Sequence, residues 1–173
     1  MERALRVTDT SGMLAVLDPD GYQSYMGWNG DLDQIGGHFV AEMARHAPLI
    51  WPTTGCEDYW TVEVADSPRA FDPADIGPQD TGLIRCTNGR LLVTNNESLT
   101  MAGMYQAVTL PQPHEKDHIL EIPSGLYTCQ ATQVGRGYRA DDVEYRYVVT
   151  LTPGGDLPPW RQAPWARDDF QNA

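Results

Sequence analysis

Alternation of apolar and polar residues along residues 143–151 is the feature that most restricts the folds open to this chain. Every odd-numbered residue in this segment is a valine, tyrosine or leucine. The even positions include Glu144, Arg146 and Thr150. Because successive side chains of a β-strand point to opposite faces, the segment is predicted to be a half-buried strand. Residues 59–65 alternate in the same way and predict a second strand. One side of this strand carries Trp60, Val62 and Val64.

Turn signals divide much of the remaining chain into further short strands. Asn88-Gly89 separates residues 83–87 from residues 90–94. This pair is a strong hairpin signal, because both turn positions must tolerate positive φ. Pro123-Ser124-Gly125 separates residues 119–122 from residues 126–134 in a second predicted turn. The other predicted strands are residues 12–17, which end at a turn beginning with Asp18, and residues 104–110.

One main helix is predicted near residues 31–46. Its apolar residues recur at three- and four-residue steps, which places them on one face. They are Leu32, Ile35, Phe39, Met43 and Ala47. Asp31 or Asp33 can cap its start, and Pro48 ends it. Six to seven strands with one helix predict an α+β fold, either an antiparallel β-sheet or a small sandwich.

The chain length of 173 residues fits a single domain, residues 1–173. Residues 66–80 contain three prolines among acidic residues and are predicted to form an exposed loop. Residues 153–173 begin with a stretch rich in Pro and Gly that cannot continue a strand. They are therefore predicted to form a C-terminal tail that lies on the surface.

Negative charge is concentrated before residue 81. The whole chain has a net charge of −12. Residues 18–80 hold twelve acids and two bases, a net charge of −10, whereas residues 81–173 hold ten acids and eight bases, a net charge of −2. Such a field repels nucleic acid and anionic membranes and attracts a cationic partner. We therefore predict one exposed acidic patch that binds a basic protein. The alternative is that the acids only keep the chain soluble.

Aromatic residues share this acidic region, since seven of the chain's 16 lie within residues 22–60. At protein interfaces, rings supply buried area and carboxylates supply specificity. The predicted partner-binding residues are Tyr22, Tyr25, Trp28, Asp31, Asp33, Glu42, Glu57 and Asp58. The alternative is that the rings form the core. This alternative is favoured for Phe39, Trp51 and Trp60, and it stays open for the three aromatic residues of the predicted set.

The segment His-Glu-Lys-Asp-His at residues 114–118 matches the zinc-protease pattern, in which two histidines four residues apart bind the metal. That pattern requires a helix of several turns, and Pro111, Pro113 and Pro123 flank the segment. An exposed polar turn is therefore favoured, and His114 and His118 remain alternative ligands of a small metal-dependent hydrolase. No phosphate loop, dinucleotide fingerprint or nucleophile elbow occurs, so we predict no catalytic residues and no cofactor.

Cysteine usage and hydropathy indicate a cellular compartment. The three cysteines, Cys56, Cys86 and Cys129, are widely spaced, and an odd number cannot all pair within one chain. Cys86 and Cys129 fall in predicted strands and are expected to be small core residues. No apolar run is long enough to span a bilayer, and the charged N-terminus is unlike a signal peptide. We therefore expect a cytoplasmic protein.

Two short segments resemble a known family. Residues 11–17 followed by Gly27-Trp28-Asn29-Gly30 resemble the opening of mostly-β immunity proteins that protect bacteria against polymorphic toxins. Residues 122–127 are similar to a strand-entry pattern in such small bacterial families. The resemblance covers about a quarter of the chain and transfers no functional residues. It implies stoichiometric binding of a toxin without catalysis.

Together these observations predict an acidic bacterial immunity protein that neutralises a basic partner, such as a secreted toxin, by occlusion. Neither nucleic acid nor membrane is expected to bind, and the oligomeric state is left open. The first alternative is an inhibitor from a phage or mobile element that mimics the charge of nucleic acid. The second alternative is the metal-dependent hydrolase with His114 and His118 as ligands.

Overall fold

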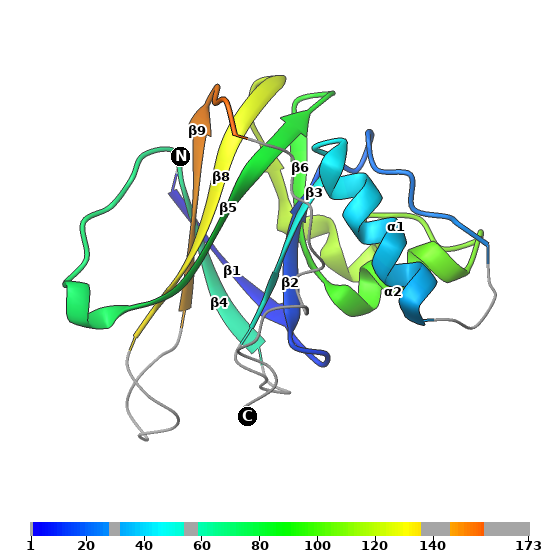
Figure 1. The fold of residues 1–173 in the computed structure, drawn as a ribbon, viewed down its shortest axis with the longest axis horizontal. Coiled ribbons are helices and arrows are strands. Elements are labelled where there is room, and N and C mark those ends of the chain that lie inside the picture. Colours follow the sequence, from blue (N-terminus) through cyan, green and yellow to red (C-terminus); the bar gives the residue numbers. More distant parts are fainter. Residues whose placement is uncertain (1, 28–31, 54–58, 136–145, 158–173) are drawn as a thin grey trace.

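A computed structural model describes residues 2–27, 32–53, 59–135 and 146–157, which form three layers: two β-sheets face to face, and helices on the second sheet (Figure 1). The first sheet has five strands in the order β1-β4-β9-β8-β5. Its strands are β1 (Glu2–Thr8), β4 (Tyr59–Ala65), β9 (Arg146–Pro153), β8 (Gly125–Val134) and β5 (Ile76–Cys86). Neighbours are antiparallel except β4 and β9, which are parallel.

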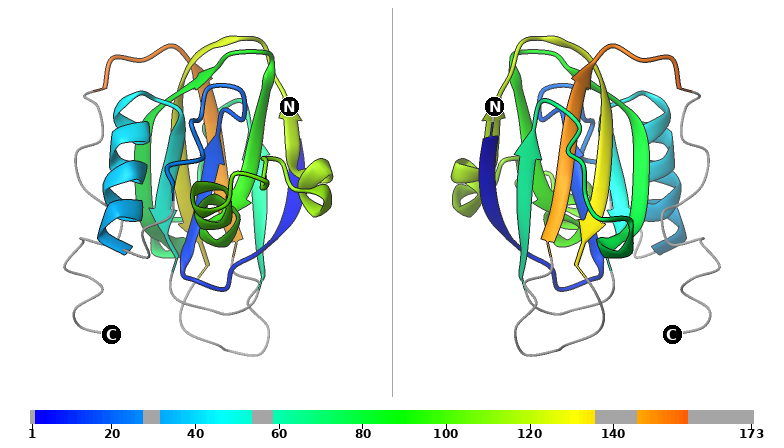
Figure 2. Two further views of the ribbon diagram at one scale, coloured as in Figure 1. Left: turned by 90° about the vertical axis from the view of Figure 1, so that its right-hand side faces the viewer. Right: turned by 90° about the vertical axis from the view of Figure 1, so that its left-hand side faces the viewer.

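The second sheet has four antiparallel strands in the order β3-β2-β6-β7. Its strands are β3 (Pro48–Pro52), β2 (Met13–Leu17), β6 (Arg90–Asn95) and β7 (Ile119–Glu121). The helices are α1 (Leu32–Ala44), α2 (Asn96–Met104) and the short 3₁₀ helices η1 (Pro73–Asp75) and η2 (Pro113–His118). Figure 2 shows α1 and α2 on one side of the molecule and the five-stranded sheet on the other. This arrangement confirms the predicted α+β class, with more strands than expected and a second helix.

Two apolar cores hold the three layers together. The core between the sheets includes Leu14, Trp51, Trp60, Tyr147 and Val149. The core between the four-stranded sheet and the helices includes Leu17, Phe39, Met43, Leu92 and Leu99. Alternate residues of β2 face opposite cores, so this strand is buried on both faces. That is why its sequence is continuously apolar.

The strongest periodic patterns correctly predict three elements. The run at 12–17 forms β2, and residues 59–65 form β4 with its three predicted apolar residues in the core between the sheets. The main helix is α1, whose residues Ile35, Phe39 and Met43 are buried. None of the helices among the described residues has the length and apolar content required to cross a membrane.

Strand β9 is more buried than its alternation predicts. Tyr147, Val149 and Leu151 face the core as expected, but Val148 and Thr150 on the opposite face are only 1% and 7% exposed. The strand lies inside the sheet between β4 and β8. The side chains on its outer face are therefore bordered by side chains of both neighbouring strands. The half-buried prediction is wrong for the described part of this strand.

The predicted hairpin at Asn88-Gly89 is also wrong. The turn exists, and Gly89 adopts a positive φ of 77°. However, β5 before it pairs with β8 in the five-stranded sheet, whereas β6 after it pairs with β2 and β7 in the other sheet. The turn at residues 123–125 likewise connects β7 in one sheet to β8 in the other. Both turns therefore link the sheets and do not close hairpins.

Other sequence predictions need smaller corrections. Residues 104–110 form no strand, because Met104 ends α2 and turns follow. The predicted loop at 66–80 contains η1, and β5 already begins at Ile76. Strands β1 and β3 and helix α2 were not predicted. Strand β9 extends to Pro153 at the start of the predicted tail, and the tail beyond residue 157 lies outside the described residues.

Candidate functional site

The predicted acidic patch requires the carboxylates of residues 18–80 to point outward together. Eight of these twelve acids have described side chains, and three of the eight, Asp18, Glu42 and Asp80, are buried. Asp18 accepts hydrogen bonds from the backbone N–H of Asp20 at 3.1 Å, the backbone N–H of Thr87 at 3.0 Å and the Thr87 hydroxyl. The Asp18 carboxylate therefore joins the turn after β2 to the turn after β5, which lie 69 residues apart in the sequence.

Two further acids are paired with arginine. Asp20 accepts from Arg90 at 2.6 and 2.7 Å, and this hydrogen-bonded guanidinium lowers the pKa of the Asp20 carboxyl. Glu63 lies 2.6 Å from Arg69 and 3.2 Å from Arg146. The last three acids, Asp66, Asp72 and Asp75, belong to the segment between β4 and β5. Among the described residues, three of these carboxylates are buried and two are paired with arginine, so these five add no unpaired exposed charge to the single patch that the sequence predicted.

Most of the predicted partner-binding residues cannot be placed on a surface. Trp28, Asp31, Glu57 and Asp58 lie outside the described residues, and Asp33 lies in the first turn of α1 with its side chain outside them. Three side chains remain: Tyr22, Tyr25 and Glu42. Tyr22 is only 8% exposed and Glu42 only 4%, whereas Tyr25 is 49% exposed.

Tyr22 and Glu42 fasten the segment that carries Tyr25 onto α1. The Glu42 carboxylate accepts hydrogen bonds from the backbone N–H of Gln23 at 3.0 Å and from Arg45 at 2.7 Å. The Tyr22 ring lies 5.7 Å from the His38 ring. Burial raises the pKa of the Tyr22 hydroxyl and lowers that of the His38 imidazole. Both groups are therefore neutral at pH 7 and suit an interior contact.

Helix α2 presents exposed residues next to this segment. The backbone N–H of Met26 donates to the carbonyl oxygen of Gly103 at 3.0 Å, which joins the two chain segments. Glu97, Met101 and Tyr105 follow one another at four-residue steps and are all exposed. Met101 is 38% exposed and Tyr105 48%.

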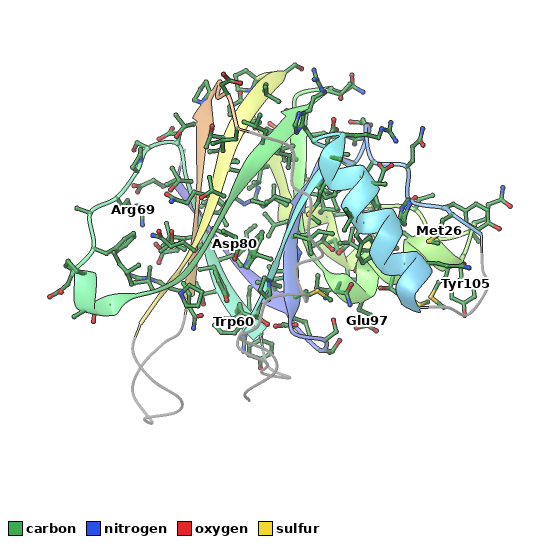
Figure 3. All side chains as sticks on the ribbon, in the orientation of Figure 1. Met26, Trp60, Arg69, Asp80, Glu97 and Tyr105 are labelled. Atoms are coloured by element: carbon green, nitrogen blue, oxygen red, sulfur yellow. The ribbon has the colours of Figure 1, made fainter. Side chains whose placement is uncertain are left out.

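These residues lie on two chain segments that the bond between Met26 and Gly103 joins, at the helical side of the molecule, where Figure 3 shows Met26 and Tyr105. We call this set the Tyr–Met surface and define it as Tyr25, Met26, Met101, Met104 and Tyr105. It contains three of the five large apolar side chains that are exposed among the described residues. Sequence reasoning found only Tyr25, because helix α2 was not recognised. The available signal was the cap at Asn95, whose side chain accepts from the Ser98 N–H at 2.8 Å.

The zinc-protease pattern at residues 114–118 has a different local structure here. These residues belong to the 3₁₀ helix η2, in which residues four apart do not share a face. Glu115 is buried, and its carboxylate accepts from the Thr94 hydroxyl and from the Gln112 N–H at 2.8 Å. Its role is to cap η2 and anchor it to β6. No group of three or more potential metal ligands is present among the described residues.

Replacing Glu115 with alanine is expected to lower the free energy of unfolding by about 2 kcal/mol, because two donors lose their acceptor. Replacing the exposed His114 with alanine should change it by no more than about 0.5 kcal/mol. Urea denaturation of both variants measures the difference. Equal stability of the two variants would contradict the capping role of Glu115.

The two described cysteines behave as core residues, as predicted. Cys86 and Cys129 are 1% and 0% exposed and belong to the core between the sheets. Burial raises the pKa of the Cys129 thiol to about 12. This thiol therefore stays protonated at neutral pH and is a poor nucleophile. Cys56 lies outside the described residues.

Comparison with known proteins shows the fold. No known protein family and no curated protein sequence matches the chain. A solved structure described as "Crocagin biosynthetic gene J" is 18% identical, with a TM-score of 0.51, and the match covers 89% of this chain and 96% of that one. ComJ from Bacillus subtilis, described as an inhibitor of the DNA-degrading activity of NucA, is 9% identical with a TM-score of 0.51. That match covers 88% of this chain and 96% of ComJ.

Proposed function

We propose that this protein is a non-catalytic inhibitor that binds an enzyme one to one and covers its active site, as an immunity protein does with its toxin. The observation that carries the proposal is the fold shared with ComJ, an inhibitor of a DNA-degrading enzyme, over nearly the full length of ComJ. The resemblance of residues 11–17 and 27–30 to immunity proteins supports the same class.

The net charge of −12 supports a basic partner of the nucleic-acid-degrading type. Enzymes that cleave nucleic acids must bind a polyanion, so they carry cationic surfaces. A negatively charged inhibitor is steered toward such a surface, even when its carboxylates are spread over the molecule. Steering acts over a Debye length, about 8 Å at physiological salt, and therefore weakens as salt is added.

The test is a titration of enzyme activity. The protein is immobilised, a lysate of the source cells is passed over it at low salt, and the retained enzyme is purified. We expect its nuclease activity to fall to zero at about one equivalent of this protein. The association rate constant should fall about tenfold or more between about 0.05 and 0.5 M salt.

An acidic protein of unrelated fold and equal net charge serves as the control and should not inhibit. The proposal is wrong if no enzyme is retained, or if the retained enzyme keeps its activity in tenfold excess of this protein. If the control protein inhibits the enzyme equally well, negative charge alone explains the inhibition and the proposal is wrong.

A further inference from the structure

We propose that the Tyr–Met surface is the docking site for the partner, and that its occupant is a basic protein surface whose Lys or Arg side chains lie against Tyr25 and Tyr105, with Glu97 at the other end of α2 as a further contact. This inference rests on the proposed function and goes further, because it assigns the contact to the helical side of the molecule. It also replaces the acidic patch that the sequence predicted.

The composition of the surface fits a protein interface. Tyrosine and methionine are enriched in interface cores, and tyrosine is among the residues whose loss most weakens binding. Single exposed apolar residues are ordinary on a protein surface, but a contiguous group indicates a contact site. Here Met26 and Met104, which neighbour Tyr25 and Tyr105 in the sequence, are half-buried and pack against the helical core. The exposed group is thus continuous with the interior.

The surface is held in place before any partner arrives. Helix α2 is capped by Asn95, and its residues Leu99 and Ala102 are fully buried. The segment with Tyr25 is fixed to α1 through Glu42 and to α2 through the bond between Met26 and Gly103. A prepositioned surface loses little conformational entropy on binding, which favours affinity.

The charge around the surface selects a cationic occupant. Glu97 shares the exposed face of α2 with Met101, and it accepts a hydrogen bond from the Thr10 hydroxyl at 2.9 Å. Within the ranges that the structure describes, Glu97 has no ion pair, and the last turn of α2 carries no basic residue. The carbonyl end of α2, next to Tyr105, adds a partial negative charge.

Tyrosine rings attract cations placed over their faces. The protein already contains this contact elsewhere, since the Arg6 guanidinium carbon lies 3.3 Å from the centroid of the Tyr59 ring. On the Tyr–Met surface, Tyr25 and Tyr105 are exposed to a similar degree as Tyr59. A partner that supplies Lys or Arg could therefore bind both rings and the Glu97 carboxylate together.

The test measures the affinity of variants for the purified enzyme isolated in the titration experiment, by calorimetry. Tyr25→Ala and Tyr105→Ala are each expected to raise Kd about tenfold or more. Glu97→Lys should raise Kd about tenfold at low salt and less at high salt. Tyr105→Phe keeps the ring and should bind nearly as well as the wild type.

Two matched controls have similar exposure but lie elsewhere. Tyr59 is 53% exposed on β4, and Ile76 is 39% exposed at the start of β5. Tyr59→Ala is the match for Tyr105→Ala, and Ile76→Ala is the match for Met101→Ala, which is also expected to raise Kd. Both controls should leave Kd within about twofold of the wild type, and each variant should shift the unfolding temperature only slightly, since the changed side chains are exposed.

Distinct results separate the failure of this inference from the failure of the function. If the wild type inhibits the enzyme and the surface variants bind as tightly as it does, the surface is wrong and the function stands. If the wild type inhibits no enzyme, both fail. If sedimentation shows a wild-type dimer that Met101→Ala dissociates, the occupant is a second copy of this chain and the inference is overturned.

Discussion

Replacing Asp9 with alanine is expected to lower the free energy of unfolding by about 4 kcal/mol, because a buried and fully hydrogen-bonded carboxylate is lost. Asp9 is 0% exposed. One of its oxygens accepts from the three backbone N–H groups of residues 11–13, at 3.2, 2.7 and 3.2 Å. The other accepts from the Thr53 hydroxyl and from the Trp60 indole N–H at 2.8 Å.

The size of this effect follows from where the donors lie. Residues 9–12 connect β1 to β2, which begins at Met13, so Asp9 holds the connection between the two sheets. Thr53 follows β3 in one sheet, and Trp60 belongs to β4 in the other. Without the carboxylate, two buried and three partly buried donors lose their acceptor, and each unsatisfied buried group costs about 1–3 kcal/mol before the site relaxes.

Urea denaturation at pH 7 measures the loss, with two variants for comparison. Asp9→Asn keeps one acceptor oxygen and should cost less than the alanine change. Asp156→Ala removes an exposed carboxylate and should change the free energy by no more than about 0.5 kcal/mol. An Asp9→Ala protein within about 1 kcal/mol of the wild type would show that the five bonds contribute little.

Periodicity in the sequence predicts elements well when they are long or strictly alternating, as α1 and β4 show. It does not specify which strands become neighbours. Asn88-Gly89 correctly marks a sharp turn, but the chain leaves one sheet and enters the other there. The deciding contacts pair β5 with β8 and β6 with β2, across large sequence separations. No local pattern contains that information.

The number of acids in a segment does not predict how many of them are exposed, for a related reason. Asp18 and Glu42 were counted with the exposed acids, yet each accepts backbone N–H groups from a distant segment. A carboxylate buried among such donors contributes nothing to an exposed patch. Which acids are buried depends on the tertiary partners, as the bond between Asp18 and Thr87 illustrates.

The candidate site could be predicted only in part. Tyr25 was selected from its turn-like surroundings, and it is exposed. Met101 and Tyr105 were missed, because α2 is short and its apolar pattern is interrupted by polar residues. Only the fold brings the segment with Tyr25 beside α2, through the bond between Met26 and Gly103.

The second large effect is expected at Trp51, the largest side chain among those that are fully buried in the described structure. It lies in β3 between the sheets, with its ring centroid 5.8 Å from that of Tyr147. Trp51→Ala removes a large apolar surface and leaves a cavity, so the free energy of unfolding should fall by about 4 kcal/mol.

Replacement of Trp51 with phenylalanine provides the matched control, because it keeps a ring and removes the indole N–H. That N–H is buried and has no hydrogen-bond partner among the described residues. Removing it relieves a desolvation cost that offsets part of the lost volume. We therefore expect Trp51→Phe to cost only about 1 kcal/mol, measured by urea denaturation beside the alanine variant. Equal cost of the two substitutions would contradict this account of the buried indole N–H.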